Sequence, residues 1–389
     1  MVGTKLMVMR VGVVGCGNIS KIYLSMANRF RDIKVVAISD LRPEVAAAQA
    51  ERFDLRAMPV HELIDSQDID IVLNLTIPSA HADVSIAALT AGKHVYSEKP
   101  LAASLVDGRR IAEAAKQTGL RVGVAPDTFL GAGAQTALHL IEDGAIGTPI
   151  IGSAAIMSRG MEHWHPNPEF FFKPGGGPVL DMGPYYVTTL VAMLGPVHKV
   201  SAVGQIGLAE RTVTAEGSPV FGSTIKVEVL TSVQAILTFK SGAQVTLQCS
   251  WDVWKHGLLP IEVHGTAGSI RVPDPNTFGG VVFLSAAGAE WEPVETSELV
   301  FGAPNWPLDA PARVNYRGLG LAEMANAILH NRPHRANAAL GLHTLAVLEG
   351  ILQSATEERP VIIQESCERP ALLRQSEAFE LLVSAASIA

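Results

Sequence analysis

Apolar runs and amphipathic segments alternate along the first third of the chain. Buried strands are expected at residues 9–14, 33–38, 69–75, 94–97 and 121–125. Helical patterns lie between them, at residues 20–28, 43–53, 79–91 and 104–118. Strands that alternate with helices at this spacing predict a parallel, doubly wound sheet.

The pattern changes near Pro126. A helix is expected at residues 132–143 and a strand at residues 149–157, before an irregular stretch at residues 158–178. A loop of this length in a compact domain is usually functional, and this one is too rich in aromatic residues for a disordered segment. A further helix is expected at residues 181–194.

Residues 197–272 alternate apolar and polar positions between turn signals such as Ser241-Gly242, which predicts an antiparallel sheet with hairpins. Two helices follow, at residues 320–330 and 340–357, and the tail from Pro360 reads as a strand and then a helix at residues 374–385. The expected fold class is therefore α/β. It combines an N-terminal Rossmann doubly wound parallel sheet with a C-terminal α+β domain that carries a large, mostly antiparallel sheet.

The domain boundary is placed at the change of pattern. Residues 1–126 are expected to form the first domain, and residues 127–389 the second.

Charge and cysteine content narrow the class of protein. The formal net charge of −8 argues against nucleic acid or an anionic membrane as a partner, because both require a basic surface. The three cysteines are widely separated and odd in number, which predicts no disulfide framework and favours a reducing, cytoplasmic location. The N-terminus has no signal-peptide pattern, and no run of about 18 apolar residues predicts a membrane span.

A G-x-G-x-x-S sequence joins the first strand to the first helix, with Gly15, Gly17 and Ser20 at its small positions. The first glycine permits a tight turn, the second lets the backbone approach a pyrophosphate, and the third position needs a small residue for packing. The helix N-terminus supplies N–H donors for phosphates. A glycine turn without a ligand is the alternative, but the strand–turn–helix setting favours dinucleotide binding, with Asn18 and Ile19 completing the loop.

Asp40 ends the second predicted strand. A carboxylate there accepts hydrogen bonds from the ribose hydroxyls of NAD and repels the 2′-phosphate of NADP, so NAD is the expected cofactor and NADP the less favoured one. The alternative role is to cap the helix that Pro43 opens. Arg42 is a further candidate contact, since an arginine there can stack on adenine or meet a phosphate.

Glu98-Lys99-Pro100 follows the strand at residues 94–97. Ligands bind at the carboxyl ends of strands in open α/β sheets. A lysine at such a place can hydrogen-bond a substrate hydroxyl or stabilise negative charge that develops on oxygen. An isolated Glu-Lys pair would indicate only a solvated surface. The interpretation as a binding residue therefore depends on the position of Lys99 at the carboxyl end of the strand.

Asp181 and Tyr185 are four residues apart at the predicted start of a helix, so both face one way. The alternatives are an N-cap for Asp181 and core packing for Tyr185. The preceding loop combines aromatic faces with polar edges, so contact with a substrate is weighed there against a structural role. Its candidates for substrate contact are Arg159, His163, Trp164 and His165. No metal is expected, because the His-x-His sequence has no third ligand at a convincing spacing.

Four motifs together resemble the glucose–fructose oxidoreductase/inositol dehydrogenase family (Gfo/Idh/MocA) over nearly the full chain. They are Gly15-Cys-Gly17-Asn-Ile-Ser20, Thr76-Ile-Pro78-Ser-Ala-His81, Ala91-Gly-Lys-His-Val-Tyr-Ser-Glu98-Lys99-Pro100 and Gly175-Gly-Gly-Pro-Val-Leu-Asp181-Met-Gly183-Pro-Tyr185. Each motif is modest alone, and their common order and spacing carry the resemblance.

The resemblance implies that Lys99 is the catalytic lysine, that Asp181 orients the substrate and that Tyr185 holds the position of the general acid/base. The family usually has His at that position, in the pattern Asp-x-Gly-x-His, so Tyr186 and His165 are kept as alternatives. A tyrosine can serve if a nearby cation lowers its pKa. The residues implied to line the nicotinamide side are Thr76, Pro78, His81 and Glu98. The family's usual Asn-x-Arg after the last Rossmann strand is replaced by Asp127-Thr128-Phe129.

The resemblance also implies an activity. The expected reaction is reversible hydride transfer between the nicotinamide of NAD and a ring hydroxyl or keto group of a sugar, anhydrosugar, glycoside or cyclitol. Two other functions stay open: an NAD-dependent glycosidase that acts by transient ring oxidation, and a non-catalytic NAD-binding sensor. Cofactor binding is thus expected in residues 1–126, and substrate binding and oligomerisation in residues 127–389. A homodimer or homotetramer through the C-terminal sheet is implied.

Overall fold

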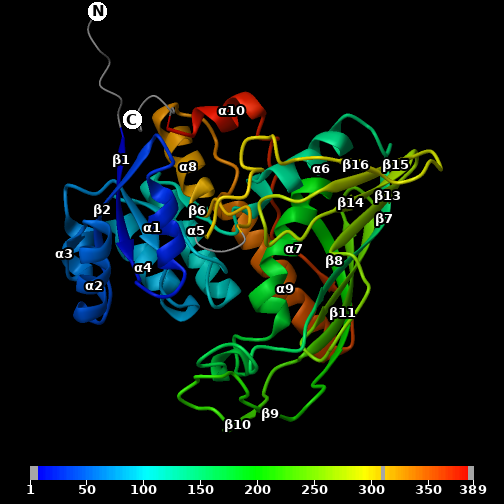
Figure 1. Ribbon diagram of the computed structural model, residues 1–389, viewed down its shortest axis with the longest axis horizontal. Helices are drawn as coiled ribbons and strands as arrows, with labels where there is room; N and C mark the ends of the chain where they lie inside the picture. Colours follow the sequence, from blue (N-terminus) through cyan, green and yellow to red (C-terminus); the bar gives the residue numbers. More distant parts are fainter. Residues whose placement is uncertain (1–7, 308–311, 384–389) are drawn as a thin grey trace, which may run out of the picture. The chain divides into compact units, whose positions relative to one another are not determined.

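The structure is a computed structural model that describes residues 8–307 and 312–383, and its chain forms two compact units (Figure 1). The first unit takes the chain up to Ala132, then Ser297–Leu342 and the segment from Pro370; the second consists of Gly133–Thr296 and His343–Arg369. Segments beyond residue 296 that the sequence analysis assigned to the C-terminal domain therefore pack with the N-terminal sheet. The assignment of cofactor and substrate binding to separate domains stays a prediction.

A six-stranded parallel sheet in the order β3-β2-β1-β4-β5-β6 forms the centre of the first unit. Its strands are β1 (Met9–Val14), β2 (Ile33–Ser39), β3 (Arg56–Ala57), β4 (Ile71–Asn74), β5 (His94–Ser97) and β6 (Val122–Val124). The helices of this unit include α1 (Ser20–Ala27), α2 (Pro43–Phe53), α3 (Val60–Asp65), α4 (Pro78–Thr90), α5 (Leu105–Thr118), α8 (Leu319–Leu329) and α10 (Gln375–Glu380). The central strands are buried along most of their length, as in parallel sheets covered on both faces. The predicted doubly wound sheet is confirmed, and its strand order reverses between β1 and β4, the place where such sheets bind ligands.

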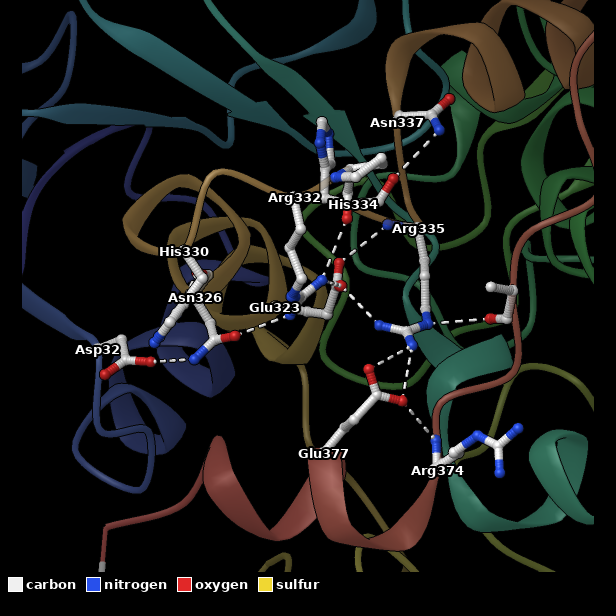
Figure 2. Close-up of polar contacts among 12 residues, drawn as sticks. Asp32, Glu323, Asn326, His330, Arg332, His334, Arg335, Asn337, Arg374 and Glu377 are labelled. Carbon is white, nitrogen blue, oxygen red and sulfur yellow. Dashed lines mark hydrogen bonds and ion pairs between the residues drawn. The ribbon is translucent and has the colours of Figure 1, made fainter.

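A buried charge cluster ties the C-terminal segment to this unit (Figure 2). Glu323 on α8 is completely buried, and its carboxylate accepts hydrogen bonds from Arg332 at 2.6 Å and Arg335 at 2.8 Å. Arg335 also donates to Glu377 on α10 at 3.0 Å. The Glu323–Arg335 pair is buried, and removing one partner of such a pair typically costs about 3–5 kcal/mol. The Arg335–Glu377 pair, whose carboxylate is 37% exposed, extends the cluster to α10.

Asp127 connects the end of the parallel sheet to the start of α8. Its carboxylate is 1% exposed and accepts the N–H groups of Gly318 at 2.9 Å and Gly320 at 3.0 Å. Burial raises the pKa of Asp127 to about 6, against the effect of these two hydrogen bonds. The residue that stands where the family usually has Asn-x-Arg therefore has a structural role inside the first unit.

A nine-stranded sheet in the order β16-β15-β14-β13-β7-β12-β11-β8-β17 dominates the second unit. Its strands are β7 (Pro149–Met157), β8 (Val197–Gln205), β11 (Ser232–Phe239), β12 (Gln244–Ser250), β13 (Ile261–Gly265), β14 (Gly268–Val272), β15 (Val282–Ala286), β16 (Glu292–Val294) and β17 (Val361–Ile362). The pair β7–β12 is parallel and the other neighbours are antiparallel. The mostly antiparallel sheet is confirmed, including the hairpin from β11 to β12 at Ser241-Gly242.

Other elements complete the second unit. They are α6 (Ala132–Glu142), α7 (Pro178–Leu194), most of α9 (Ala338–Glu357) and a two-stranded ribbon of β9 (Glu210–Thr212) and β10 (Thr224–Lys226), which lies beyond one end of the large sheet (Figure 1). The helix α7 packs on β7, β11 and β12.

The sheet face away from α7 carries exposed apolar side chains. The strand register places Ile151, Val203, Ile236 and Phe283 on the same face, and all four are at least one-third exposed. On the opposite face, alternating positions of β11 and β12 are buried. The alternation thus separates a packed face from an open one.

The helix α9 is long and apolar enough to cross a membrane by length and composition, with a mean hydropathy of 1.2. Of that stretch, 61% is buried inside the structure, as is common for core helices. Length and composition are therefore weak grounds for a membrane span here.

Candidate active site

The loop after β1 has the geometry that a dinucleotide pyrophosphate requires. Gly15 has φ +104°, and a Cβ on it would lie 2.5 Å from the carbonyl oxygen of Leu75 on the neighbouring strand end. A Cβ on Gly17 would have no atom within 4 Å, so the backbone there faces open space. Ser20 is completely buried, and its hydroxyl donates to the Gly17 carbonyl at 2.7 Å. The tight turn at Gly15 and the packing of the small Ser20 are therefore as the motif predicts, and phosphate binding by this loop stays a prediction.

Asp40 is fixed beside this loop. The N–H of Cys16 donates to Asp40 Oδ2 at 2.8 Å, and the N–H of Arg42 donates to Oδ1 at 3.0 Å. The N-cap of α2 is Arg42, with no side-chain capping bond, so Asp40 is not the helix cap considered as its alternative role. The carboxylate, 13% exposed, is held next to the glycine loop, where the ribose of a bound dinucleotide is expected. The Arg42 side chain is 67% exposed and has only a loose contact of 3.7 Å with Asp40.

The ends of β4 and β5 are joined by a buried polar network. His81 on α4 is completely buried, with one ring nitrogen 2.7 Å from the Pro100 carbonyl and the other 3.0 Å from the Thr76 carbonyl. Burial lowers the pKa of His81, which the two carbonyls partly oppose. A residue with both nitrogens occupied and no exposed surface supports the loops that hold Thr76 and Pro100. The resemblance implies that His81 lines the nicotinamide side, and because its side chain is buried it would act there through the loops that it supports.

Sequence reasoning missed Asn74, which organises the same network. Asn74 is completely buried; its amide donates to the His81 carbonyl and to Ser85 Oγ, both at 3.1 Å, and its oxygen accepts the Thr76 hydroxyl at 2.6 Å. The sign of this role in the sequence is a single amide residue at the end of an otherwise apolar strand, β4. Pro78 occupies the first turn of α4.

Glu98 and Lys99 follow β5 at the same edge of the sheet. The Glu98 carboxylate is 8% exposed and accepts the Tyr23 hydroxyl at 2.9 Å and the Lys99 N–H at 2.8 Å. Burial, and secondly the charge of Glu98, raise the pKa of Tyr23 well above its ordinary value. Because its oxygens are engaged, Glu98 shapes the backbone at Lys99, and the half-buried lysine stands at the carboxyl edge of β5. Tyr23 was not foreseen, since it lies inside the helical pattern of α1.

In the second unit, α7 carries Asp181 and Tyr185. The helix begins at Pro178, three residues before the predicted start, and its N-cap is Gly177 with φ +91°. Asp181 therefore lies in the first turn of α7, and the N-capping alternative for this residue is wrong. Tyr185 is 7% exposed and one helical turn further along.

The two alternative acid/base residues differ in their surroundings. Burial raises the pKa of Tyr186, whose hydroxyl interacts with Asp274, so this phenol is disfavoured as a proton carrier. Burial lowers the pKa of His165, while the hydrogen bond from the Asn167 N–H and, secondly, the charge of Asp181 oppose this effect. His165 therefore keeps its standing as the alternative to Tyr185.

The candidate substrate residues of the loop do not form one group. His165 packs edge-on against Trp164, Phe170 and Phe171, with ring centroids 5.1–5.6 Å apart. Arg159 instead stacks on Trp254, with its guanidinium carbon 3.9 Å from the ring centroid.

His163 is the remaining candidate for substrate contact in this loop. His163 Nδ1 is buried, and no group in the described part of the chain hydrogen-bonds to it. Within residues 8–307 and 312–383, no group of three or more metal-ligating side chains could hold a metal ion.

A Rossmann sheet with a glycine loop at the start of α1, a carboxylate beside it and a lysine at the sheet edge is typical of a dinucleotide-dependent oxidoreductase. Residues 9–125 match the oxidoreductase family with an NAD-binding Rossmann fold, and residues 134–271 match the GFO/IDH/MocA C-terminal domain. The chain belongs to the Gfo/Idh/MocA family of NAD-binding oxidoreductases.

Named relatives agree with this membership. The chain is 29% identical over 287 residues to inositol 2-dehydrogenase 3 of Saccharopolyspora erythraea, which covers 73% of this chain and 77% of the relative. It is 28% identical over 301 residues to 1,5-anhydro-D-fructose reductase of Ensifer adhaerens, which covers 75% of this chain and 84% of the relative.

Solved structures share the fold. An NAD-binding oxidoreductase from Klebsiella pneumoniae superposes with a TM-score of 0.79 at 22% identity, over 92% of this chain and 99% of the other. Levoglucosan dehydrogenase in complex with NADH and L-sorbose superposes with a TM-score of 0.77 at 23% identity, again over 92% and 99%.

Proposed function

We propose that this protein reversibly oxidises a ring hydroxyl of a sugar, anhydrosugar, glycoside or cyclitol with NAD. The observation that carries the proposal is the common edge of the parallel sheet, which presents the Gly15 loop, the Asp40 carboxylate and Lys99. Relatives named for inositol, 1,5-anhydro-D-fructose and levoglucosan support a polyol ring as the substrate class.

The cofactor site accounts for a preference for NAD. The α1 N-terminus and the open backbone at Gly17 would hold the pyrophosphate, with Asn18 and Ile19 in the same turn. Asp40 would accept the ribose hydroxyls, and its negative charge opposes a 2′-phosphate. When bound, NAD supplies the acceptor for the hydride.

The chain's own residues would handle the proton and the charge on oxygen. We assign Lys99 to stabilise negative charge that develops on the substrate oxygen, since a positioned cation acts most strongly on charge that appears during the reaction. Asp181 would accept a substrate hydroxyl and so orient the ring. Tyr185 would exchange the proton of the reacting hydroxyl, with His165 as the alternative.

The site proposal is tested by a panel of monosaccharides, anhydrosugars, methyl glycosides and inositols, each assayed with NAD and with NADP. Formation of NADH from at least one of these compounds is the expected result. A panel without any NADH formation, measured on protein that binds NAD, would oppose the proposed function.

We further propose that the protein forms a homodimer or homotetramer through the open face of the nine-stranded sheet. The exposed residues Ile151, Val203, Ile236 and Phe283 support this, because apolar residues on one sheet face favour association. Light scattering of the wild type and of an Ile236→Lys variant tests it, with dissociation expected in the variant. The cytoplasmic location stays a prediction.

A further inference from the structure

A pocket of about 420 Å³ lies within the second unit, where the chain leaves β7 and β12 and passes β9. Its lining includes Arg159, Glu162, Glu210, Arg211, Asp252 and Trp254. This volume falls in the range of small-molecule sites in proteins. Of the proposed catalytic and substrate residues, only Arg159 lines it.

The floor of the pocket is a buried ion network. The Arg211 side chain is 3% exposed and donates to Glu162 Oε1 at 2.9 Å, to the Arg159 carbonyl at 3.0 Å and to the Asp252 carboxylate. Asp252 Oδ2 also accepts the Thr231 hydroxyl at 2.7 Å. One guanidinium thus faces two carboxylates, which leaves the floor with a net negative charge and a fixed geometry.

The wall of the pocket is a cation stacked on an indole. Trp254 is 78% exposed, and the guanidinium carbon of Arg159 lies over its ring, 3.9 Å from the ring centroid. Within the described residues, no carboxylate forms an ion pair with this guanidinium. Its N–H donors are therefore free for a ligand, and stacking holds them in place.

The charges of floor and wall select the class of ligand. The net negative floor and the Glu210 carboxylate oppose an anion, and the Arg159 cation over Trp254 opposes a cationic ligand. A neutral compound with many hydroxyls satisfies both sides, because hydroxyls donate to carboxylates and accept from a guanidinium. The hydroxyl-bearing side chains of Thr212 and Thr214 on the rim suit the same ligand.

The loop that lines the pocket also reaches the proposed catalytic helix. Arg159 and Glu162 stand at one end of residues 159–165, and His165, whose pKa the charge of Asp181 on α7 raises against the effect of burial, stands at the other. The Met161 carbonyl accepts the His165 N–H at 2.9 Å, which closes this segment into a turn.

We propose that this pocket binds a non-reacting sugar ring of a glycoside or disaccharide substrate. The inference rests on the proposed function, because it assumes that another ring of the same substrate is oxidised. It narrows the substrate class from a single ring to a molecule of at least two rings.

The test compares methyl glycosides with disaccharides that share the same reacting sugar, using the full chain and NAD. We expect at least one disaccharide with a KM about tenfold below that of its methyl glycoside, the difference that one well-packed contact group supplies. Trp254→Ala should raise the disaccharide KM about tenfold and leave the methyl glycoside KM and kcat unchanged. Trp291→Ala is the matched control, because Arg271 stacks on Trp291 at 3.8 Å outside this pocket, and it should change neither sugar.

Equal KM values for both sugars in the wild type would overturn the inference, and so would a Trp254→Ala variant that affects both sugars alike or leaves the disaccharide KM unchanged. If the wild type oxidises no sugar, the proposed function fails separately. Calorimetric titration of the same disaccharides then decides about the pocket: binding that Trp254→Ala abolishes supports it, and binding absent from the wild type overturns it.

Discussion

Asp40→Asn is the substitution that tests the cofactor site most sharply. The change keeps the size of the side chain but removes its negative charge. It also keeps an oxygen that can accept the Cys16 N–H, which lies 2.8 Å from Asp40 Oδ2 in the wild type. If Asp40 selects against NADP by charge, the variant should bind NADP much more tightly and NAD slightly more weakly.

The magnitude follows from the position of the carboxylate. Asp40 is 13% exposed, so the effective dielectric constant lies between that of bulk water and that of a buried site. Two unit charges about 5 Å apart then repel by about 1–3 kcal/mol, which corresponds to about 5-fold to 150-fold in the ratio of dissociation constants. The 2′-phosphate carries at least one such charge, so the NAD/NADP preference should fall by this factor in the variant.

The assay is a fluorescence titration of wild type and variant with both cofactors at one fixed salt concentration. Asp83→Asn is the matched control, because Asp83 is 81% exposed on α4 and its loss changes the net charge equally. Asp83→Asn should leave the preference unchanged. Tighter binding of NADP than NAD by the wild type, or an unchanged preference in Asp40→Asn, would show that the charge of Asp40 does not select the cofactor.

Substitutions at three further residues probe catalysis and stability. Lys99→Ala should lower kcat by about 10²–10³-fold with only a small change in NAD affinity, and near-full activity would remove Lys99 from the mechanism. Tyr185→Phe should lose about 10²–10⁴-fold in kcat while it keeps NAD binding. Tyr185→His should show activity with a pH midpoint of about 6.5. A fully active Tyr185→Phe variant would assign the proton transfer to His165 instead. Burial raises the pKa of Asp127 from 3.8 to about 6, so the folded protein holds this proton more tightly than the unfolded chain. The resulting contribution to the free energy of unfolding is present below about pH 4 and is lost as the pH rises through about 6, by up to about 3 kcal/mol. In urea denaturation, Asp127→Asn should remove this part of the pH dependence. The prediction is wrong if the free energy of unfolding changes between about pH 4 and above about pH 6 by the same amount in the variant and in the wild type.

Much of the fold could be predicted from local patterns because the strands of the first unit are buried apolar runs. The two-residue β3 and the six-residue α3 were missed, since segments this short show no recognisable period. The parallel pair β7–β12 could not be foreseen either, because a strand's own pattern does not name its partner. The segment around Glu323 packs in the first unit through an ion cluster, and local sequence patterns do not show which charged residues will meet in such a cluster.

The candidate site shows the same division. The glycine loop and Asp40 were found because the motif fixes their spacing, yet the bond from Cys16 to Asp40 required the fold. The burial of His81 between two carbonyls gave it a supporting role that its sequence motif does not indicate. Arg159 was grouped with His165 by proximity in the chain, whereas the structure places its side chain on Trp254.

Net oxidation of a sugar or cyclitol ring by NAD can be measured as the stoichiometry of one turnover. The measurement combines NADH absorbance with mass spectrometry of the product from the best compound in the panel. We expect one NADH for each product molecule, and a product that lacks two hydrogens relative to the substrate. Sugar release by hydrolysis without net NADH would indicate a glycosidase instead, and NAD binding without any conversion would indicate a sensor; either result would rule out net oxidation.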